Sequence, residues 1–237
     1  MDHAHQKTMD RVYRHMKHVY DATRPFFLAG RRRLRQHAIS GGGKRILEVG
    51  CGTARNLILL ARAMPEAHFT GIDISSEMCR YAREQVARHD LSDRIEIFEG
   101  ELADFVASTI AADYAEPFDT VLFSFSLSMI PDWWEVLEAA FEIVAADGGR
   151  ILIADFGPCQ AWPSLARWRL YKNLTYFHVF PRPDLPERLD RLAGAILRDE
   201  RLLGGYGMVL DVVVAPAGGA AARGDTSFPI SSRVATS

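Results

Sequence analysis

Apolar residues along the chain form short continuous runs, and these alternate with stretches in which apolar positions recur every three or four residues. A short run bounded by glycine or polar turn residues is typical of a buried strand, whereas the wider spacing predicts a helix. The predicted strands are Ile46–Val49, His68–Ile72, Arg94–Phe98, Thr120–Phe125 and Arg150–Phe156. Strands that alternate with helices predict a mostly parallel sheet with helices on both faces.

Several polar residues and one proline mark where these helices begin and end. Pro65 is expected to end the first helix, either Ser75 or Ser76 to cap the second, and Asp132 to cap the helix after the fourth strand.

Two further apolar runs near the C-terminus predict an antiparallel hairpin. Ala195–Leu203 and Met208–Val214 are separated only by the glycine-rich turn 204–207. A connection this short can join antiparallel strands but cannot cross over between parallel ones. The predicted fold is therefore α/β and doubly wound, with a mostly parallel seven-stranded sheet and an antiparallel hairpin at its C-terminal edge.

A glycine turn follows the first predicted strand, and an acid ends the second. The turn reads Gly50-Cys51-Gly52-Thr53, and the acid is Asp73. In an open parallel sheet these strand ends lie side by side at the carboxyl edge, where ligands bind. Glycines let a ligand approach the backbone closely, and an acid at this position can accept hydrogen bonds from ribose hydroxyls. The pair predicts a site for a ligand that contains a nucleoside.

The residues around the turn bear on which nucleoside is bound. A NAD site typically carries G-x-G-x-x-G, with the pyrophosphate on the helix N-terminus. Here Arg55 stands at the place of the third glycine, and Glu48 puts a carboxylate near the turn. A carboxylate suits an ammonium group and repels a phosphate. A NAD-binding or purely structural Rossmann turn is the alternative interpretation.

The string from Glu48 to Thr53, with Asp73 at this spacing, resembles motif I and the ribose acid of class I S-adenosylmethionine (SAM) methyltransferases. That family more often has glycine where this chain has Ala54. The resemblance implies SAM as cofactor and S-adenosylhomocysteine as product. The implied cofactor-binding residues are Glu48, Gly50, Cys51, Gly52, Thr53, Asp73, Ile74, Met78, Glu101, Leu102 and Ser124.

Two of these assignments have alternatives, and one further position is open. Ile74 and Met78 are implied to pack on the adenine face, but Met78 is equally explained as ordinary core. Glu101 stands where the family more often has Asp. Asn56 is either a contact at the methionine end of SAM or a solvated helix position.

The formal net charge of −2 hides a strong asymmetry along the chain. Residues 1–45 hold eleven Lys and Arg against three Asp, a net charge of +8. Such a segment predicts an anionic partner surface, either membrane or nucleic acid.

The cysteine count and the apolar runs bear on the cellular compartment. Three cysteines, an odd number, do not predict a disulfide framework. The sequence shows neither an apolar leader nor a run long enough to span a membrane. We expect a cytoplasmic protein in contact with a membrane surface.

Aromatic and basic residues interleave in two segments outside the cofactor motifs. The first, within residues 1–45, is predicted to form a basic helical lid over the SAM pocket, although a basic solvated helix is the alternative. The second, residues 162–182, combines Trp, Tyr and Phe with Arg and Lys. That composition suits a membrane interface or, nearly as well, the core of a substrate domain.

Three stretches narrow the resemblance. Tyr20–Arg24, Phe27–Arg31 and His178–Arg182 resemble the bacterial betaine-lipid N-methyltransferases, which trimethylate the amine of diacylglyceryl homoserine. The resemblance covers roughly residues 9–215. It implies a lid at 1–45 and a methyltransferase domain at 46–215, and the Gly/Ala/Ser-rich residues 216–237 are expected to form a disordered tail.

The resemblance also implies roles on the acceptor side. In-line attack of a neutral amine on a sulfonium needs no metal or covalent intermediate, so catalysis is largely alignment. The catalytic candidates, which would orient the amine or accept its proton, are Tyr20, Ser126 and His178. The candidates for holding a methylammonium or a carboxylate are Tyr13, Arg24, Arg31, Trp133 and Arg182. For His178, a plain core or surface histidine is the alternative.

Other functions share the same cofactor motifs. A phosphatidylethanolamine N-methyltransferase or a small-molecule methyltransferase would use the same parts. Nucleic-acid amine methyltransferases often carry Asn/Asp-Pro-Pro-Tyr after the fourth strand, whereas residues 126–131 here read Ser-Leu-Ser-Met-Ile-Pro. We therefore expect a lipid head group and no nucleic acid as partner. A non-catalytic binding module is the least favoured class, because the cofactor residues are intact.

Overall fold

The computed structural model describes residues 30–111, 116–145, 148–176, 178–193 and 196–214. Three predicted site residues, Tyr13, Tyr20 and Arg24, lie outside the described residues, as do most of the predicted lid and the predicted tail.

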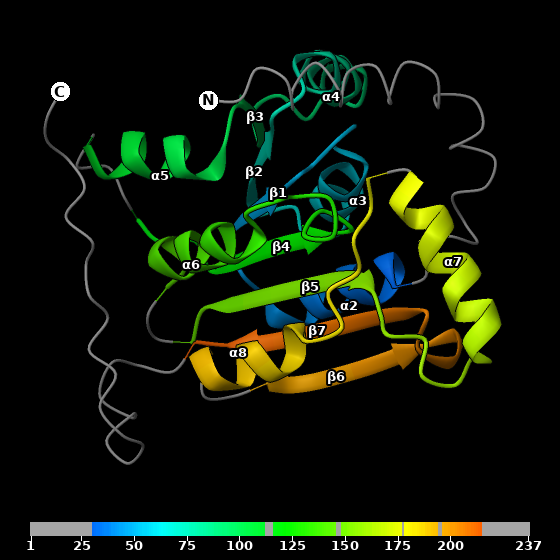
Figure 1. Ribbon diagram of the computed structural model, residues 1–237. Coiled ribbons are helices and arrows are strands. Elements are labelled where there is room, and N and C mark those ends of the chain that lie inside the picture. The colour runs from blue at the N-terminus through cyan, green and yellow to red at the C-terminus, as the bar shows by residue number, and fades with distance from the viewer. Residues whose placement is uncertain (1–29, 112–115, 146–147, 177, 194–195, 215–237) are drawn as a thin grey trace, which may run out of the picture.

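Seven strands form one sheet in the order β3-β2-β1-β4-β5-β7-β6 (Figure 1). They are β1 (Arg45–Val49), β2 (His68–Asp73), β3 (Ile95–Glu99), β4 (Thr120–Ser124), β5 (Arg150–Phe156), β6 (Ile196–Leu202) and β7 (Gly207–Val213). The first five are parallel, and β7 runs antiparallel to both of its neighbours, β5 and β6. The predicted fold class is confirmed. The hairpin joins the sheet through its second strand, β7, which lies between β5 and β6.

Helices cover both faces of this sheet (Figure 1). One face carries α2 (Arg31–Gly41), α3 (Arg55–Ala63) and α4 (Ser76–Arg88), and the other carries α5 (Leu102–Ala111), α6 (Trp133–Ile143) and α8 (Leu185–Ala193). The remaining described helix, α7 (Ser164–Tyr176), follows β5. Successive strand side chains point to opposite faces, so Ile46 packs with the first layer and Leu47 with the second.

Local geometry explains one departure from the predicted strand boundaries and decides how the predicted helix caps are formed. The fourth strand ends at Ser124, one residue early, because Phe125 has a left-handed φ of 58° that no strand can accommodate. Ser75 caps α4 as one of the two expected residues, since its hydroxyl accepts from the Met78 amide at 3.3 Å. Asp132 occupies the cap position of α6, but its side chain makes no capping hydrogen bond.

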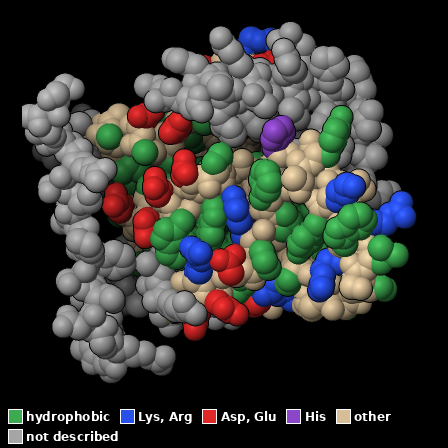
Figure 2. Space-filling view, in the orientation of Figure 1, with side chains coloured by type: hydrophobic (Ala, Val, Ile, Leu, Met, Phe, Trp, Pro, Cys, Tyr) green, Lys and Arg blue, Asp and Glu red, His purple; other side chains and the backbone are tan. Residues whose placement is uncertain are grey.

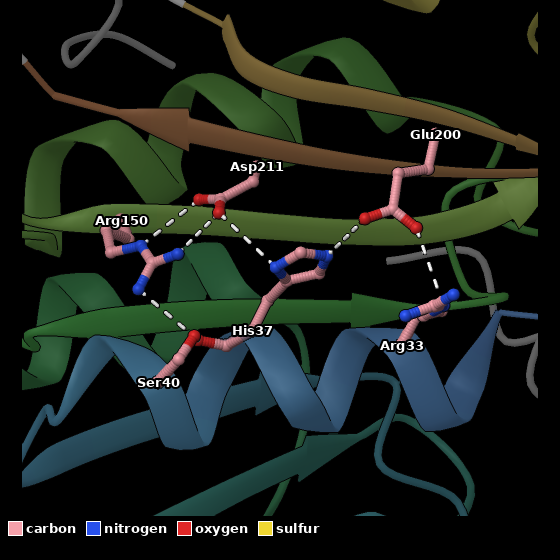
Figure 3. A network of polar contacts seen from close by, with 6 residues as sticks. All are labelled: Arg33, His37, Ser40, Arg150, Glu200 and Asp211. Atoms are coloured by element: carbon pink, nitrogen blue, oxygen red, sulfur yellow. Dashed lines mark hydrogen bonds and ion pairs between the residues drawn. The ribbon is translucent and has the colours of Figure 1, made fainter.

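A buried polar network fastens α2 to the hairpin side of the sheet (Figure 3). Arg150 pairs with Asp211 through both guanidinium and carboxylate forks, and its Nη1 donates to the His37 carbonyl at 3.3 Å. His37 Nε2 lies 2.9 Å from Glu200 Oε1. A side chain on Gly41 would place its Cβ 2.0 Å from Nη1 of Arg150, so the guanidinium would have to move from this position. Residues 31–41 of the predicted lid segment are thus a packed layer of the domain.

Among the helices in the described part of the chain, none combines the length and the apolar character needed to cross a bilayer.

Candidate functional site

The carboxyl ends of β1 and β2 meet as the sequence predicted. The backbone amides of Gly50 and Cys51 both donate to the Ile72 carbonyl, at 2.8 and 3.0 Å. Gly52 N donates to Asp73 Oδ2 at 2.8 Å, and Ser75 N donates to Asp73 Oδ1 at 3.0 Å. The Asp73 carboxylate is therefore held in one orientation. A carboxylate oxygen can accept more than one hydrogen bond, and the sequence prediction that Asp73 accepts from ribose hydroxyls is compatible with this orientation.

The glycine turn leaves room where a ligand would approach. Gly50 (φ 73°) lies against the turn after β4, since an added Cβ would come within 2.6 Å of Ser126 Cβ. Gly52 (φ 54°) faces open space, with no described atom within 4 Å of such a Cβ. Ala54, where the resembled family more often has glycine, also has a left-handed φ of 55°. That conformation costs a non-glycine residue about 1 kcal/mol, which explains the family's preference.

A buried hydrogen-bond network lies beneath this turn, on the α2 and α3 side of the sheet. Asn56 Nδ2 donates to Glu48 Oε1 at 2.7 Å and to Ser124 Oγ at 3.0 Å. Arg35 Nη1 in turn donates to Asn56 Oδ1 at 2.9 Å. Asn56 is only 4% exposed, so its interpretation as a solvated helix position is wrong.

The environment of Glu48 suits a bound cation. The residue is 1% exposed, and burial raises the pKa of its carboxyl to about 7, against the lowering effect of the Asn56 hydrogen bond and of Arg31 and Arg35. Its Oε2 has no hydrogen-bond partner among the described residues. A buried carboxylate with one oxygen unsatisfied would be stabilised by an ammonium. The residues present therefore fit the methionine end of SAM.

Two arginines of α2 approach the same end of the site. The Arg31 guanidinium lies 5.9 Å from the centre of the Phe125 ring, and its charge acts on Glu48. Sequence reasoning placed Arg31 with the acceptor and missed Arg35. The signal for Arg35 is its spacing of four from Arg31, which puts both side chains on one helix face.

The candidates for the adenine side are brought to the neighbouring strand ends. Gly100 N donates to the Asp73 carbonyl at 3.0 Å, so the end of β3 lies beside the end of β2. Ile74 and Met78 are half-buried, and the buried face of α4 is formed by other residues. Glu101 is exposed just before α5. The Leu102 side chain is buried in the core beneath α5 and α6.

Among the residues predicted to bind the acceptor, two segments far apart in the sequence meet after β4. Ser126 is buried, and its Oγ has no hydrogen-bond partner in the described part of the chain. Phe180 N donates to the Ser128 carbonyl at 2.7 Å. Arg182 Nη2 donates to the Ile130 carbonyl at 3.0 Å. The stretch from 178 to 182, which carried the narrower resemblance, therefore lies on the turn that Ser126 opens.

The two remaining acceptor candidates among the described residues, His178 and Trp133, differ in their exposure and their contacts. His178 is exposed and has a left-handed φ of 56°. Trp133 is buried, and its ring lies 5.4 Å from the Arg182 guanidinium and 5.3 Å from that of Arg188. The cations that contact Trp133 in the structure are thus these two arginines. Its role toward a methylammonium stays a prediction.

Asp155 is a further buried acid near the acceptor turn that sequence reasoning missed. It is the next-to-last residue of the apolar strand β5, is 1% exposed, and accepts from Ser128 N at 2.9 Å and from Phe156 N at 2.7 Å. Burial raises the pKa of its carboxyl to about 6, although these hydrogen bonds and the charge of Arg182 act in the opposite direction. Asp155 therefore ties the turn after β4 to the end of β5. Its signal is an acid inside a run of apolar residues.

Within the described residues, no group of three or more His, Cys, Asp or Glu side chains could hold a metal ion.

Comparison with known proteins gives the family. The profile of a family described as "Methyltransferase domain" matches residues 40–187, more than half of the chain. Demethylmenaquinone methyltransferase from Listeria monocytogenes serotype 4a (strain HCC23) is 29% identical over 140 residues, which are 59% of this chain and 54% of that protein. The chain thus spans about half the length of this curated relative.

Solved structures share the fold. An O-methyltransferase family protein from Burkholderia thailandensis superposes with a TM-score of 0.65 at 18% identity, covering 83% of this chain and 57% of that one. The O-methyltransferase from Bacillus cereus in complex with SAH gives 0.54 at 19% identity, covering 86% and 90%. The predicted fold and general family are confirmed. The chain therefore belongs to the methyltransferase-domain family and has the class I fold of SAM-dependent methyltransferases.

Proposed function

We propose that this protein transfers methyl groups from SAM to the amine of a lipid head group, and that diacylglyceryl homoserine is its acceptor. One observation carries the proposal. Described residues from two of the three stretches that resemble betaine-lipid N-methyltransferases lie beside the end of β4 and the turn that follows it. Arg31 approaches Phe125, Phe180 N donates to the Ser128 carbonyl, and Arg182 donates to the Ile130 carbonyl. These contacts support the proposal because they bring residues of both stretches to the segment that would hold the acceptor.

Each part of the site has a chemical task in this proposal. Bound SAM supplies an electrophilic methyl on its sulfonium. Asp73 would accept from the ribose hydroxyls, and Glu48 would accept from the methionine ammonium. Arg31 and Arg35 lie near Glu48 and would counter the methionine carboxylate. The turn from Ser126 to Ile130 would hold the acceptor in line with the methyl, so that alignment supplies most of the rate.

The acceptor amine must be neutral and correctly oriented to attack. Ser126 could orient its lone pair by accepting an N–H hydrogen bond, because its buried Oγ has no partner among the described residues. Tyr20 and His178 are the further candidates for orienting the amine or removing its proton. Arg24 and Arg182 would bind the homoserine carboxylate. The second and third methylations repeat the same step on one nitrogen, which requires space for the methyls already added.

A small-molecule acceptor is the second candidate function. The match to a protein named demethylmenaquinone methyltransferase favours it, although that match covers only part of both chains. Phosphatidylethanolamine is the third, because it also presents a primary amine on a lipid head group.

A single assay separates these acceptors. Purified protein with labelled SAM is offered diacylglyceryl homoserine, phosphatidylethanolamine or demethylmenaquinone in detergent micelles, and products are identified by mass spectrometry. We expect methylated homoserine lipid up to the trimethyl form, and loss of product with the Glu48→Gln variant as control. Transfer to demethylmenaquinone or phosphatidylethanolamine in place of the homoserine lipid would move the function to that acceptor. Transfer to none of the three would refute a lipid amine as substrate.

A further inference from the structure

Among the helices that the structure describes, α7 has the fewest buried side chains. It spans 13 residues after β5, and Leu174 is the only one of its side chains that is buried. Leu170 and Tyr171 are half-buried and pack against the core beside it. Viewed along the helix, these three residues share one face, which attaches α7 to the domain. Figure 1 shows α7 at the edge of the molecule toward which β4 and β5 point, the edge that carries the candidate site.

The opposite face of α7 exposes large apolar side chains in a stripe. Leu165, Trp168 and Tyr176 are 67%, 58% and 81% exposed, and Lys172 completes their helical spacing of three, four and four. Leu203, 62% exposed, extends this surface from the turn before β7. It lies close to the start of α7, since Trp162 Nε1 donates to the Leu203 carbonyl at 2.9 Å. We call Leu165, Trp168, Lys172, Tyr176 and Leu203 the α7 face.

The charged side chains of helix α7 are all basic. The helix sequence contains Arg167, Arg169 and Lys172, all exposed, and no acid. The Lys172 ammonium lies 5.1 Å from the centre of the Trp168 ring, so its stem follows the aromatic surface. Figure 2 shows hydrophobic and basic side chains mixed over α7 at the right, whereas acidic side chains lie mainly on the left and in the lower middle of the view.

We propose that the α7 face is a docking surface for an anionic lipid bilayer, which would turn the carboxyl edge of the sheet toward the membrane. Exposed Trp and Leu among Lys and Arg, without acids, match the interfacial layer, where rings enter the head-group region and cations meet lipid phosphates. A water-soluble acceptor would need no such surface. The inference rests on the proposed lipid acceptor and names where the protein meets it.

The test measures vesicle binding by the full chain. Binding to phosphatidylcholine vesicles containing phosphatidylglycerol is compared for the wild type, Trp168→Ser and Lys172→Gln. We expect Trp168→Ser to raise the dissociation constant about tenfold, on the scale of one buried aromatic side chain. Lys172→Gln should raise it about fivefold, on the scale of one basic residue at an anionic surface, and only at low salt. The matched controls are Ile39→Ser, at an exposed apolar residue, and Arg88→Gln, at an exposed basic residue of α4. Both lie outside the α7 face and should bind as the wild type does.

A second measurement reports how deeply Trp168 enters the lipid bilayer. Brominated phosphatidylcholine should quench the tryptophan fluorescence of the bound wild type, and Trp168→Phe should lose that quenching while it still sediments with vesicles. Unchanged vesicle binding of Trp168→Ser, or undiminished quenching in Trp168→Phe, would overturn the inference. A concentration-dependent dimer that Trp168→Ser converts to monomer would also overturn it, because a second copy of the chain would then be the occupant.

Activity separates this inference from the proposed function. With a short-chain, water-soluble homoserine lipid analogue, the α7 variants should turn over like the wild type, and only their rate on vesicle substrate should fall. If the wild type methylates the soluble analogue but the variants bind vesicles normally, the docking surface is wrong and the function stands. If the wild type methylates neither substrate while binding vesicles through Trp168, the function is wrong and the docking surface stands.

Discussion

Asn56 holds one oxygen of Glu48 and leaves the other without a hydrogen-bond partner among the described residues. The Asn56 amide donates to Oε1 at 2.7 Å, and the glutamate is 1% exposed at the end of β1. A buried carboxylate in this state is unfavourable to ionise without a ligand, and burial is the first cause that raises its pKa to about 7. The arrangement becomes favourable once a cation arrives, so Glu48 should link protonation to both stability and cofactor binding.

Glu48 should make the ligand-free protein less stable as pH rises. Its pKa is raised from 4.5 in the unfolded chain to about 7 in the fold, so the folded state holds the proton more tightly between these values. Its contribution to stability is full below pH 4.5 and is lost as pH rises through 7, by about 3 kcal/mol. The free energy of unfolding of the wild type minus that of Glu48→Gln, followed by urea titration, should show this fall. Taking the difference cancels the parallel contribution of Asp155. A flat difference across this range would contradict the assignment.

The same group should make SAM binding pH-dependent. A protonated Glu48 cannot hold the methionine ammonium, so binding must first remove the proton. The SAM dissociation constant should therefore fall about tenfold for each pH unit up to about 7, and level off there before the α-amino group itself titrates. Calorimetric titrations of the wild type and Glu48→Gln give the comparison. The variant should bind weakly at every pH, and a pH slope retained in Glu48→Gln would assign the dependence to another residue.

Asp73 should support both the cofactor and its own loop. Asp73→Ala should weaken SAM binding by more than tenfold, because two hydrogen bonds to a charged acceptor are worth about 1.5–3 kcal/mol each. It should also lower the melting temperature, since Gly52 N and Ser75 N lose their acceptor. Asp73→Asn keeps one acceptor oxygen and should fall between wild type and Asp73→Ala in both measurements. A folded Asp73→Ala variant with wild-type SAM affinity would remove Asp73 from the site.

The sheet was predictable because strand and helix periodicity are local properties of the sequence. The glycine turn and Asp73 could be paired from sequence because parallel strands end at the same edge. The insertion of β7 between β5 and β6 was not predictable, since periodicity shows a hairpin without showing which of its strands joins the sheet. The left-handed φ of Ala54 was likewise not predictable from the sequence pattern. The only indication of it was that the resembled family more often has glycine at this position.

The site residues that were missed all depend on contacts between distant segments. Arg35 reaches Asn56 across 21 residues because α2 packs beside α3. Asp155 accepts from Ser128 across 27 residues because β4 and β5 are neighbours. Trp133 showed the helical spacing of a packing residue, but nothing near it in the sequence indicated that arginines from α8 and the preceding loop would contact its ring.

Gly50 and Ser126 should behave as a coupled pair. Gly50→Ala forces a Cβ to within 2.6 Å of Ser126 Cβ at a φ of 73°, so it should cost about 1–3 kcal/mol of stability and weaken SAM binding. Ser126→Gly removes the clash and leaves the unfavourable φ. The double variant should therefore recover part of the stability lost by Gly50→Ala, which a double-mutant cycle from urea unfolding measures. Strict additivity would show that the clash relaxes by itself. Gly52→Ala is the control, because its Cβ meets no described atom within 4 Å.

Asp211 should be the most costly polar residue to remove on the hairpin side of the sheet. Its carboxylate is 1% exposed, pairs with Arg150 and lies 3.7 Å from His37 Nδ1 (Figure 3). Asp211→Ala leaves the Arg150 guanidinium without its carboxylate partner in the layer between α2 and the sheet. This loss should lower the free energy of unfolding by about 3–5 kcal/mol. The matched control is the exposed pair Arg188–Asp184, where Asp184→Ala should cost only about 0–1 kcal/mol. Double replacement of Arg150 by Met and Asp211 by Leu should recover much of the loss, because no buried charge then remains unpaired. Equal, small losses in Asp211→Ala and Asp184→Ala would mean that water or a rearranged α2 satisfies Arg150, and that α2 is not fastened to the sheet by this pair.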